Sequence, residues 1–316
     1  MRFFHDTKIN FVGKRQIFFF VSAVVLVVGI LSITILGVDF GIDFEGGTEI
    51  AVRFDKEVST EELRSQIVAA GIDGAEIKSY GKDNQFLIRA KLTQDAAQTI
   101  RKTLNSGFKG YEVTILKEDI IGPRIGGELR NDMYIAVFLS VLAILAYVAF
   151  RFQFVYGLGA VVALIHDVIV TFSFLVIFHN LGIMNLEVNQ TILAGMLTVI
   201  GFSINDTVII FDRIRENRDK TKSSLNFIKM VNTSINETLS RTVNTVGTIL
   251  LVLVPLVFIG GPVLEGFALT MLIGVITGTY SSIFIASSFV IWYLEKVKKI
   301  KMDSEISKDD NAVSPV

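Results

Sequence analysis

Long runs of apolar residues alternate with polar connections along most of the chain. A helix needs roughly 20 mostly apolar residues to cross the hydrocarbon core of a bilayer. The stretches that reach or approach this length are Gln16–Val38, Met133–Phe150, Phe154–Phe178, Leu186–Phe211, Val243–Ile259 and Gly266–Leu294. The fifth is short, so we expect its helix to begin upstream, after Asn232. The pattern predicts an α-helical polytopic membrane protein with six transmembrane helices.

The first stretch has one feature of a secretion signal, because it follows the basic pair Lys14 and Arg15. The apolar part of a signal is about 7 to 15 residues long and ends in small residues at a cleavage site. This stretch is longer and ends in Gly37, Val38 and Asp39. We therefore expect an uncleaved membrane anchor.

One segment, residues 39–132, has the composition of a soluble domain. Apolar residues with a period of two predict strands there, and a period of 3.6 predicts helices. The expected elements are a strand Thr48–Phe54, a helix Thr60–Ala70 capped by Ser59 or Thr60, strands Glu76–Tyr80 and Gln85–Leu92 joined by a turn Gly81–Asn84, a helix Gln94–Leu104 and a strand Tyr111–Leu116. The order β-α-β-β-α-β is that of the ferredoxin-like split unit, so we expect a small α+β ferredoxin-like exterior domain. This fold hosts many functions, and we expect the domain to bind or position something rather than to catalyse.

Lysine and arginine residues fall on alternate connections between the spans, and short basic loops stay on the cytoplasmic side of a membrane. The basic groups are Arg2, Lys8, Lys14 and Arg15 before the first span, Arg151 after the second, six residues between Arg213 and Lys229 after the fourth, and Lys296, Lys298, Lys299 and Lys301 after the sixth. We therefore predict that both termini are cytoplasmic.

The chain then divides into four parts. Residues 1–38 form the cytoplasmic N-terminus and first transmembrane helix, and residues 39–132 form the exterior domain. Residues 133–294 form a five-helix transmembrane bundle with a basic cytoplasmic loop at 212–232. We expect residues 295–316 to be a disordered cytoplasmic tail.

The composition agrees with a membrane environment, since 51% of the residues are hydrophobic and the mean hydropathy is +0.55. The 30 basic and 31 acidic residues nearly cancel, so the net charge does not indicate nucleic-acid binding. There is no cysteine, and three histidines, His5, His166 and His179, leave little material for a metal site. Walker, HExxH and zinc patterns are absent from the sequence. We therefore expect no catalytic residues, no cofactor and no metal, and a protein that is not an enzyme.

Polar side chains interrupt two of the predicted spans. His166 and Asp167 lie near the middle of the third, and Asn205 and Asp206 lie within the fourth. An ionised carboxylate at the centre of a membrane helix costs on the order of 2.5 to 3.5 kcal/mol on insertion scales, so such residues face the bundle interior and commonly mark proton routes. Burial favours the neutral carboxyl, which would let Asp167 or Asp206 exchange protons near neutral pH. The alternative is a structural hydrogen-bond cluster between helices.

Arg241 is the basic residue best placed to pair with Asp206. If the fifth helix begins near Asn232, Arg241 enters the membrane from the same side as Asp206. A carboxyl that pairs alternately with arginine and with a proton can couple proton flow to helix movement. In the alternative, Arg241 extends to the lipid headgroups. Both interpretations are open from the sequence.

Small residues gather in three places. The clusters at the domain junctions predict hinges or, equally, tight turns that close the domain onto the membrane; they are Gly41, Gly46 and Gly47 in GIDFEGGT and Gly122, Gly126 and Gly127 in GPRIGGEL. In the last span small residues recur every four positions, at Gly266, Thr270, Gly274, Gly278, Ser282 and Ala286. That spacing keeps them on one helix face, which predicts close packing there.

Several motifs resemble the SecF branch of the SecD/SecF family of bacterial protein-export membrane proteins, within the resistance-nodulation-division superfamily. The resemblance covers nearly the whole chain and is carried by GIDFEGGT (41–48), GPRIGGEL (122–129), FSINDTVIIFDRIREN (202–217), SRT (240–242) and GGPVLEGFALTMLIG (260–274). It implies that Asp206 of NDT and Arg241 of SRT form a proton-handling pair.

The resemblance also implies partners and a location. The partners would be SecD, with which six spans become twelve, the SecYEG channel and the exported preprotein. The location would be the bacterial cytoplasmic (inner) membrane, with residues 39–132 in the periplasm, and the function would be export driven by the proton motive force. Six spans are half of a superfamily transporter, which fits the absence of an internal repeat. Two other functions stay open, namely half of a proton-driven small-molecule or lipid transporter and a passive translocase scaffold.

Overall fold

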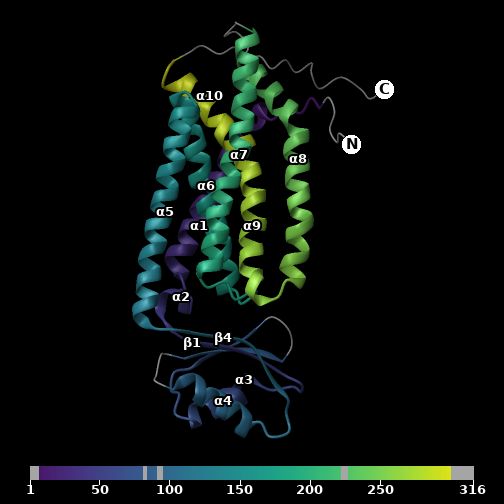
Figure 1. Ribbon diagram of the computed structural model, residues 1–316. Coiled ribbons are helices and arrows are strands. Elements are labelled where there is room, and N and C mark those ends of the chain that lie inside the picture. The colour runs from purple at the N-terminus through teal and green to yellow at the C-terminus, as the bar shows by residue number, and fades with distance from the viewer. Residues whose placement is uncertain (1–6, 81–83, 91–94, 222–226, 300–316) are drawn as a thin grey trace, which may run out of the picture.

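The computed structural model describes residues 7–80, 84–90, 95–221 and 227–299. The chain forms a bundle of long helices with a small sheet-containing domain at one end (Figure 1). Several predictions lie outside the described residues, namely those on residues 81–83 of the turn, on the helix start at Gln94, on His5 and on the tail after residue 299.

Among the described residues, six helical stretches are long and apolar enough to cross a membrane, which confirms the predicted number. They are α1 (Arg15–Leu36) with the short turn η1 (Val12–Lys14) before it, α5 (Pro123–Arg151), α6 (Phe154–Asn180), α7 (Gln190–Thr221), α8 (Phe227–Ile259), and a last span composed of α9 (Pro262–Ser281), the π-helical turn η3 (Ser282–Ala286) and α10 (Ser287–Lys296). The fifth span does begin upstream of its apolar run. Its start at Phe227 is earlier than the expected position after Asn232.

Other span boundaries also differ from the prediction. α7 continues to Thr221 rather than ending at Phe211, and α8 already includes residues 227–232, so most of the predicted basic loop at 212–232 is helical. The starts of two spans differ as well. α5 begins at Pro123 rather than Met133, because its first turns are charged and escape a hydropathy criterion. Pro123 is well suited to a first helical position, and Arg124 pairs with Glu128 at 3.0 Å one turn later. α7 begins later than the predicted Leu186, because the Asn189 side chain accepts a hydrogen bond from the backbone N–H of Ile192 at 2.8 Å and caps the helix there.

The domain between α1 and α5 has the predicted order. Its elements are β1 (Gly47–Phe54), α3 (Thr60–Ala69), β2 (Glu76–Ser79), β3 (Gln85–Ala90), α4 (Ala96–Gly107) and β4 (Val113–Ile121). The sheet order is β2-β3-β1-β4 with antiparallel neighbours, so the ferredoxin-like prediction is confirmed. Ser59 caps α3 by accepting from the Glu62 backbone N–H at 3.1 Å. A short helix, α2 (Ile42–Glu45), lies between α1 and β1 and was not predicted.

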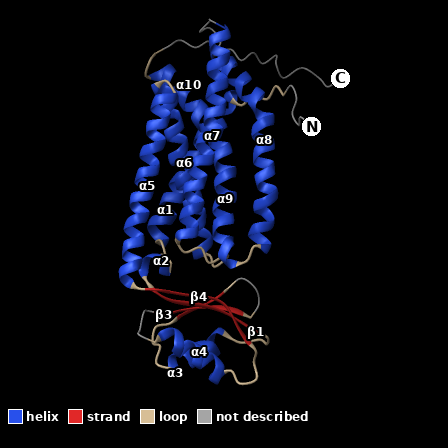
Figure 2. Cartoon of the chain, in the orientation of Figure 1, coloured by secondary structure: helices blue, strands red, loops and turns tan. Residues whose placement is uncertain are grey.

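The two faces of this sheet differ in character. On one face, Ile50, Val52 and Ile88 pack against Leu63 of α3 and Ile100 of α4 to form the core of the domain. The other face is directed toward the helical bundle (Figure 2). A strand places successive side chains on opposite faces, so the charged residues Glu49 of β1 and Arg89 of β3 lie on that second face.

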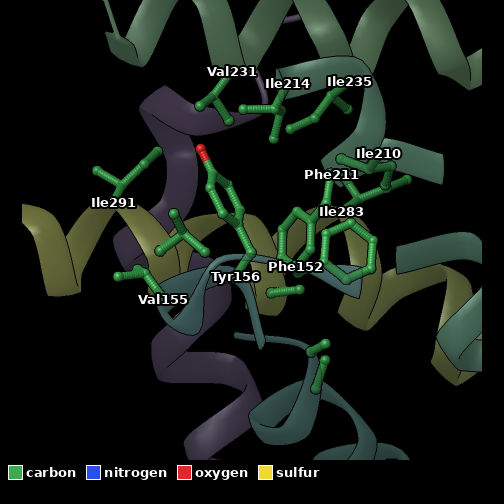
Figure 3. Close-up of a cluster of buried hydrophobic side chains, with 14 of the residues drawn as sticks. Phe152, Val155, Tyr156, Ile210, Phe211, Ile214, Val231, Ile235, Ile283 and Ile291 are labelled. Atoms are coloured by element: carbon green, nitrogen blue, oxygen red, sulfur yellow. The ribbon is translucent and has the colours of Figure 1, made fainter. Parts of the chain in front are cut away.

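A separate hydrophobic core holds the spans together at the end of the bundle opposite the sheet. Figure 3 shows Phe152 and Tyr156 packed with Phe211 and Ile214 of α7. The Tyr156 and Phe211 rings meet edge to face, with centroids 5.1 Å apart. Val231, Ile235, Ile283 and Ile291, from α8, η3 and α10, join the same cluster. The buried acidic residues of α6 and α7 lie between this core and the exterior domain.

Candidate functional site

Asp167 is held by hydrogen bonds from three directions. It lies near the middle of α6 and is 1% exposed. Its Oδ2 accepts from Ser203 Oγ on α7 at 2.5 Å and from Ser281 Oγ on α9 at 2.7 Å. Its Oδ1 lies 3.0 Å from Nδ1 of the adjacent His166. One carboxyl group therefore ties three spans together, as a structural cluster would.

His166 extends this network toward α1. Its ring stacks on Tyr280 of α9, with ring centroids 6.0 Å apart. The Tyr280 hydroxyl donates to the Phe18 carbonyl of α1 at 3.0 Å and lies 2.8 Å from Ser22 Oγ. His166 and Asp167 thus belong to a connected set of polar groups that spans four helices.

Asp206 has a different environment although it is just as deeply buried. It lies near the middle of α7 with 0% of its surface exposed. Thr279 Oγ1 lies 3.5 Å from its Oδ2, which is long for a hydrogen bond between oxygens. Its Oδ1 has no hydrogen-bond partner among the described residues. A buried carboxylate with so few donors is costly, and a bound proton removes much of that cost.

The other two predicted members of the site are exposed. Arg241 lies on α8, which packs against α7, and it is near enough to Asp206 for their charges to attract. No salt bridge joins the two side chains in the part of the chain that the structure describes. Asn205 is next to Asp206 in sequence, but its side chain is exposed rather than buried with the carboxyl. The structure therefore gathers His166 and Asp167 in one place and leaves Asp206 close to, but not paired with, Arg241.

The column of small residues on the last span lies against α7. Facing pairs are Gly266 with Ile192, Gly274 with Val199, Gly278 with Ser203, and Ser282 with Thr207. A methyl group on Gly274 would lie 2.2 Å from Val199 Cγ2, so the two helices can approach only because this residue is glycine. The column ends in η3, the π-helical turn that follows Ser281, whose hydroxyl donates a hydrogen bond to Asp167. Such turns occur frequently at functional sites.

Glycines of the two junctions contact each other. A Cβ on Gly126 would lie 2.9 Å from the Gly46 backbone nitrogen, and a Cβ on Gly46 would lie 2.9 Å from Pro123 Cα. Gly46 and Gly47 also have φ angles of +76° and +141°, which side chains disfavour. These contacts favour the tight-turn interpretation, in which α2 is pressed against the start of α5.

The remaining junction glycines are less constrained. Gly41 is buried, and its backbone N–H donates to the Val188 carbonyl at 2.9 Å. A Cβ on Gly122 or Gly127 would meet no described atom within 4 Å. A hinge therefore stays a prediction, and Gly122 and Gly127 are the positions with room for one.

Glu187 is a buried charge that the sequence did not single out. It lies in the loop between α6 and α7 and is 5% exposed. Its carboxylate forms salt bridges with Arg89 of β3 and, at 3.1 Å, with Lys78 of β2. On the same face, Glu49 of β1 pairs with Arg89 and with Lys117, both at 3.0 Å. This charge cluster fastens the sheet to the loop that leads into the helix of Asp206.

These salt bridges shift the pKa values of the three cations. Burial alone lowers the pKa of Arg89, but its hydrogen bonds with Glu187 and Glu49 outweigh this and raise it. Burial also lowers the pKa of Lys78 and of Lys117. Hydrogen bonds with their acidic neighbours outweigh this effect, so both pKa values are raised. All three side chains are therefore held firmly in their charged form.

The segment after α1 contacts the same loop. Phe40 forms a parallel bridge with Val188, and Asp43 Oδ2 accepts from the Gln190 backbone N–H at 3.0 Å at the start of α7. Asp39 lies 2.9 Å from Nε2 of His179, at the end of α6. The exterior domain is thus attached to both ends of the loop between α6 and α7.

Family models match two parts of the chain. Residues 100–296 match "Protein export membrane protein SecD/SecF, C-terminal", and residues 31–58 match "SecD/SecF GG Motif". The first match alone covers more than half of the chain. The chain belongs to the SecD/SecF family. The GG-motif match contains Gly46 and Gly47, and the C-terminal match contains both buried acids of the bundle.

Individual SecD/SecF proteins are similar over almost the full length. A protein translocase subunit SecF of Desulfurispirillum indicum is 40% identical over 93% of this chain and 93% of its own length, and one of Pseudomonas aeruginosa is 36% identical over 90% and 91%. The crystal structure of SecDF, a translocon-associated membrane protein from Thermus thermophilus, is 35% identical with a TM-score of 0.80. It matches 92% of this chain, which spans only 39% of the SecDF chain.

Proposed function

We propose that the chain is an accessory subunit of the Sec protein-export translocase that uses the proton motive force, with Asp206 as its proton-binding group. The family and the translocase names of its relatives support the first part. The proton-binding role is supported by the surroundings of the Asp206 carboxyl. It is fully buried near the middle of the span, it has one weak contact, and one of its oxygens has no described donor. Such a group can gain or lose a proton without dismantling a hydrogen-bond cluster.

Arg241 is the second element of this proposal. When Asp206 is ionised, the long Arg241 side chain moves toward it from the neighbouring α8 and compensates the buried charge. When Asp206 is protonated, that attraction is lost and Arg241 returns to the exposed position seen here. The two protonation states therefore favour different arrangements of α7 and α8, which is the requirement for coupling proton flow to movement.

Asp167 and His166 have a supporting role in this proposal. Each oxygen of Asp167 already has a partner, and loss of Oδ2 would leave the buried Ser203 hydroxyl without its acceptor. We propose that this network fixes α6, α7 and α9 so that motion is confined to the Asp206 side. Asn205, which is exposed, has no direct part in proton binding.

The proposed partner is SecD. This chain corresponds to 39% of a SecDF chain, so a complete assembly contains a second, larger part. We further propose the SecYEG channel and an exported preprotein as the other partners. The basic loops support cytoplasmic termini, which would put the exterior domain in the periplasm, where it contacts the emerging preprotein.

Export in inverted membrane vesicles tests the central part of this proposal. Asp206→Asn in the complex with SecD should abolish the stimulation of export by a proton gradient, whereas Asn205→Ala should leave it intact. Arg241→Met should resemble Asp206→Asn. A passive scaffold predicts instead that all three variants export as the wild type does. Proton-coupled efflux of a small molecule with unchanged export would favour the transporter alternative.

A further inference from the structure

A cavity at the other end of the bundle is separate from the buried acids. It has a volume of about 150 Å³, which exceeds the space that one water molecule needs. Its lining comes from the turn between α5 and α6 and from the last turns of α7: Phe152, Gln153, Tyr156, Phe211, Arg215, Arg218 and Asp219. The aromatic part of this lining is visible in Figure 3.

The N-terminus of α6 opens at this cavity without a cap. Gln153 occupies the N-cap position, but its side chain makes no capping hydrogen bond, and the first turn has no acidic residue. Gln153 Oε1 instead accepts from Arg218 at 3.3 Å. The free N–H groups and the positive end of the dipole of a 27-residue helix therefore stay available to an anion.

Two side chains of the lining have no hydrogen-bond partner among the described residues. Tyr156 is 6% exposed, and its hydroxyl, although near the Arg218 guanidinium, has no hydrogen-bond partner within the described ranges. Arg215 is exposed and forms no salt bridge or hydrogen bond with any described residue, so its guanidinium is free to bind a ligand. The buried hydroxyl lacks a partner, and an anionic ligand could accept hydrogen bonds from both groups.

The charge of the lining is positive. Arg215 and Arg218 outnumber the acidic Asp219. The nearby Asp212 does not reverse this balance, because it already pairs with Arg151 at 2.6 Å. A phosphate group suits this set, since guanidinium groups and helix N-termini both bind phosphate oxygens.

The surroundings of the cavity identify the source of the phosphate. Phe150 and Phe154, on either side of the turn between α5 and α6, are 94% and 70% exposed at this end of the spans. Trp292 of α10 is also exposed. Tryptophan is enriched at the level of the headgroups, so Trp292 indicates that this end of the spans lies there. The apolar rings of Phe150 and Phe154 are surfaces that acyl chains can cover.

We propose that this cavity binds the phosphate of an anionic phospholipid, such as cardiolipin or phosphatidylglycerol, from the adjacent leaflet. Arg215, Arg218 and the α6 N-terminus bind the phosphate oxygens, the Tyr156 hydroxyl donates a further hydrogen bond to them, and the acyl chains lie along Phe150 and Phe154. Basic pockets between membrane helices are known to bind such headgroups. The site does not depend on the proposed role of Asp206.

Native mass spectrometry of the full-length chain, released from detergent with cardiolipin, phosphatidylglycerol or phosphatidylcholine, tests this proposal. The two anionic lipids should stay bound and phosphatidylcholine should not. Replacing both arginines, as Arg215→Gln with Arg218→Gln, should weaken cardiolipin binding by about tenfold or more, since two charge-assisted hydrogen bonds are lost. Tyr156→Phe should weaken it by a smaller factor.

A control variant with the same change in charge separates a site from a generally basic surface. Lys220→Gln with Lys229→Gln also removes two positive charges near this end of the bundle, but neither lysine lines the cavity. This control should bind cardiolipin as the wild type does. Equal weakening in both double variants, or equal retention of phosphatidylcholine, overturns the proposal. Full displacement of cardiolipin by millimolar inorganic phosphate would also overturn it, in favour of a site for free phosphate.

Discussion

Asp167 and Asp206 are equally buried in neighbouring helices, yet their surroundings differ. Three donors surround Asp167, from His166 of its own helix and from Ser203 and Ser281 of two others. Asp206 has one distant hydroxyl. Burial alone therefore does not mark a proton site. A carboxyl group whose oxygens are already satisfied serves to hold helices together, whereas one whose oxygens are not is ready to exchange a proton.

The largest expected effect comes from Asp206. In a SecD-containing complex, Asp206→Asn should eliminate proton-driven stimulation of export, and Asp206→Glu should retain part of it because a titratable group is still present. Export rates in vesicles with and without a proton gradient measure both. Full stimulation in the asparagine variant would show that Asp206 is not the proton-binding group.

For the stability of the fold, we expect substitution of Asp167 to have a larger effect than substitution of Asp206. Asp167→Ala should destabilise the folded chain by about 3 kcal/mol, because it removes the hydrogen bonds with His166, Ser203 and Ser281 and leaves the Ser203 hydroxyl buried without an acceptor. Asp206→Ala should cost less than about 1 kcal/mol, since no strong hydrogen bond is lost. Unfolding by denaturant in detergent compares the two. Equal losses would remove the distinction between a structural and a titrating carboxyl.

Features that depend on neighbouring residues could be predicted from the sequence, whereas features that depend on contacts between distant parts of the chain could not. The six spans and the order of the exterior domain follow from local patterns, so they were predictable. The start of α5 was missed because Arg124, Glu128 and Asp132 conceal a helix from hydropathy. The contrast between the two acids was not accessible, because it depends on which hydroxyls of other helices reach each carboxyl.

Glu187 was missed for a similar reason. Its partners, Arg89 and Lys78, are about a hundred residues away along the chain, and nothing in its own loop indicates them. One feature of the sequence could have indicated Glu187, namely that it is an acidic residue in a short loop without lysine or arginine. A charge in such a place needs a partner from elsewhere in the fold.

The packing that brings α9 beside both acids gives the next largest effect. Gly274→Ala should destabilise the bundle by about 2 kcal/mol, because the new methyl group would collide with Val199. Gly201→Ala on α7 is the matched control, since no described atom lies within 4 Å of a Cβ there. Thermal unfolding of the two variants should differ clearly, and similar behaviour would contradict the close approach of α7 and α9.

The attachment of the exterior domain should respond more weakly. Glu187→Gln should loosen the sheet from the bundle by about 1 kcal/mol, because Arg89 keeps Glu49 and Lys78 keeps Glu76. Hydrogen exchange of β2 and β3 should become faster, while that of α3 and α4 should not change. Unchanged exchange in the strands would show that the charge cluster does not hold the domain.

The smallest effect is expected from pH. The pKa values of Arg89, Lys78 and Lys117 are all raised above those of the unfolded chain, so the contribution of the cluster is complete below about pH 10 and is lost only as the pH rises through the folded-state values. Exchange in β2 and β3, corrected for its intrinsic rate, should therefore stay constant from pH 7 to pH 9. A marked increase over that range would contradict the assignment.

Infrared difference spectroscopy can distinguish the two acids, because it observes the protonated carboxyl group itself. The complex with SecD should show a carboxylic-acid C=O band that changes with pH. If Asp206 is the proton-binding group, Asp167→Asn should retain a band that Asp206→Asn has lost. If the band instead disappears in Asp167→Asn and persists in Asp206→Asn, Asp167 is the proton-binding group and Asp206 is not.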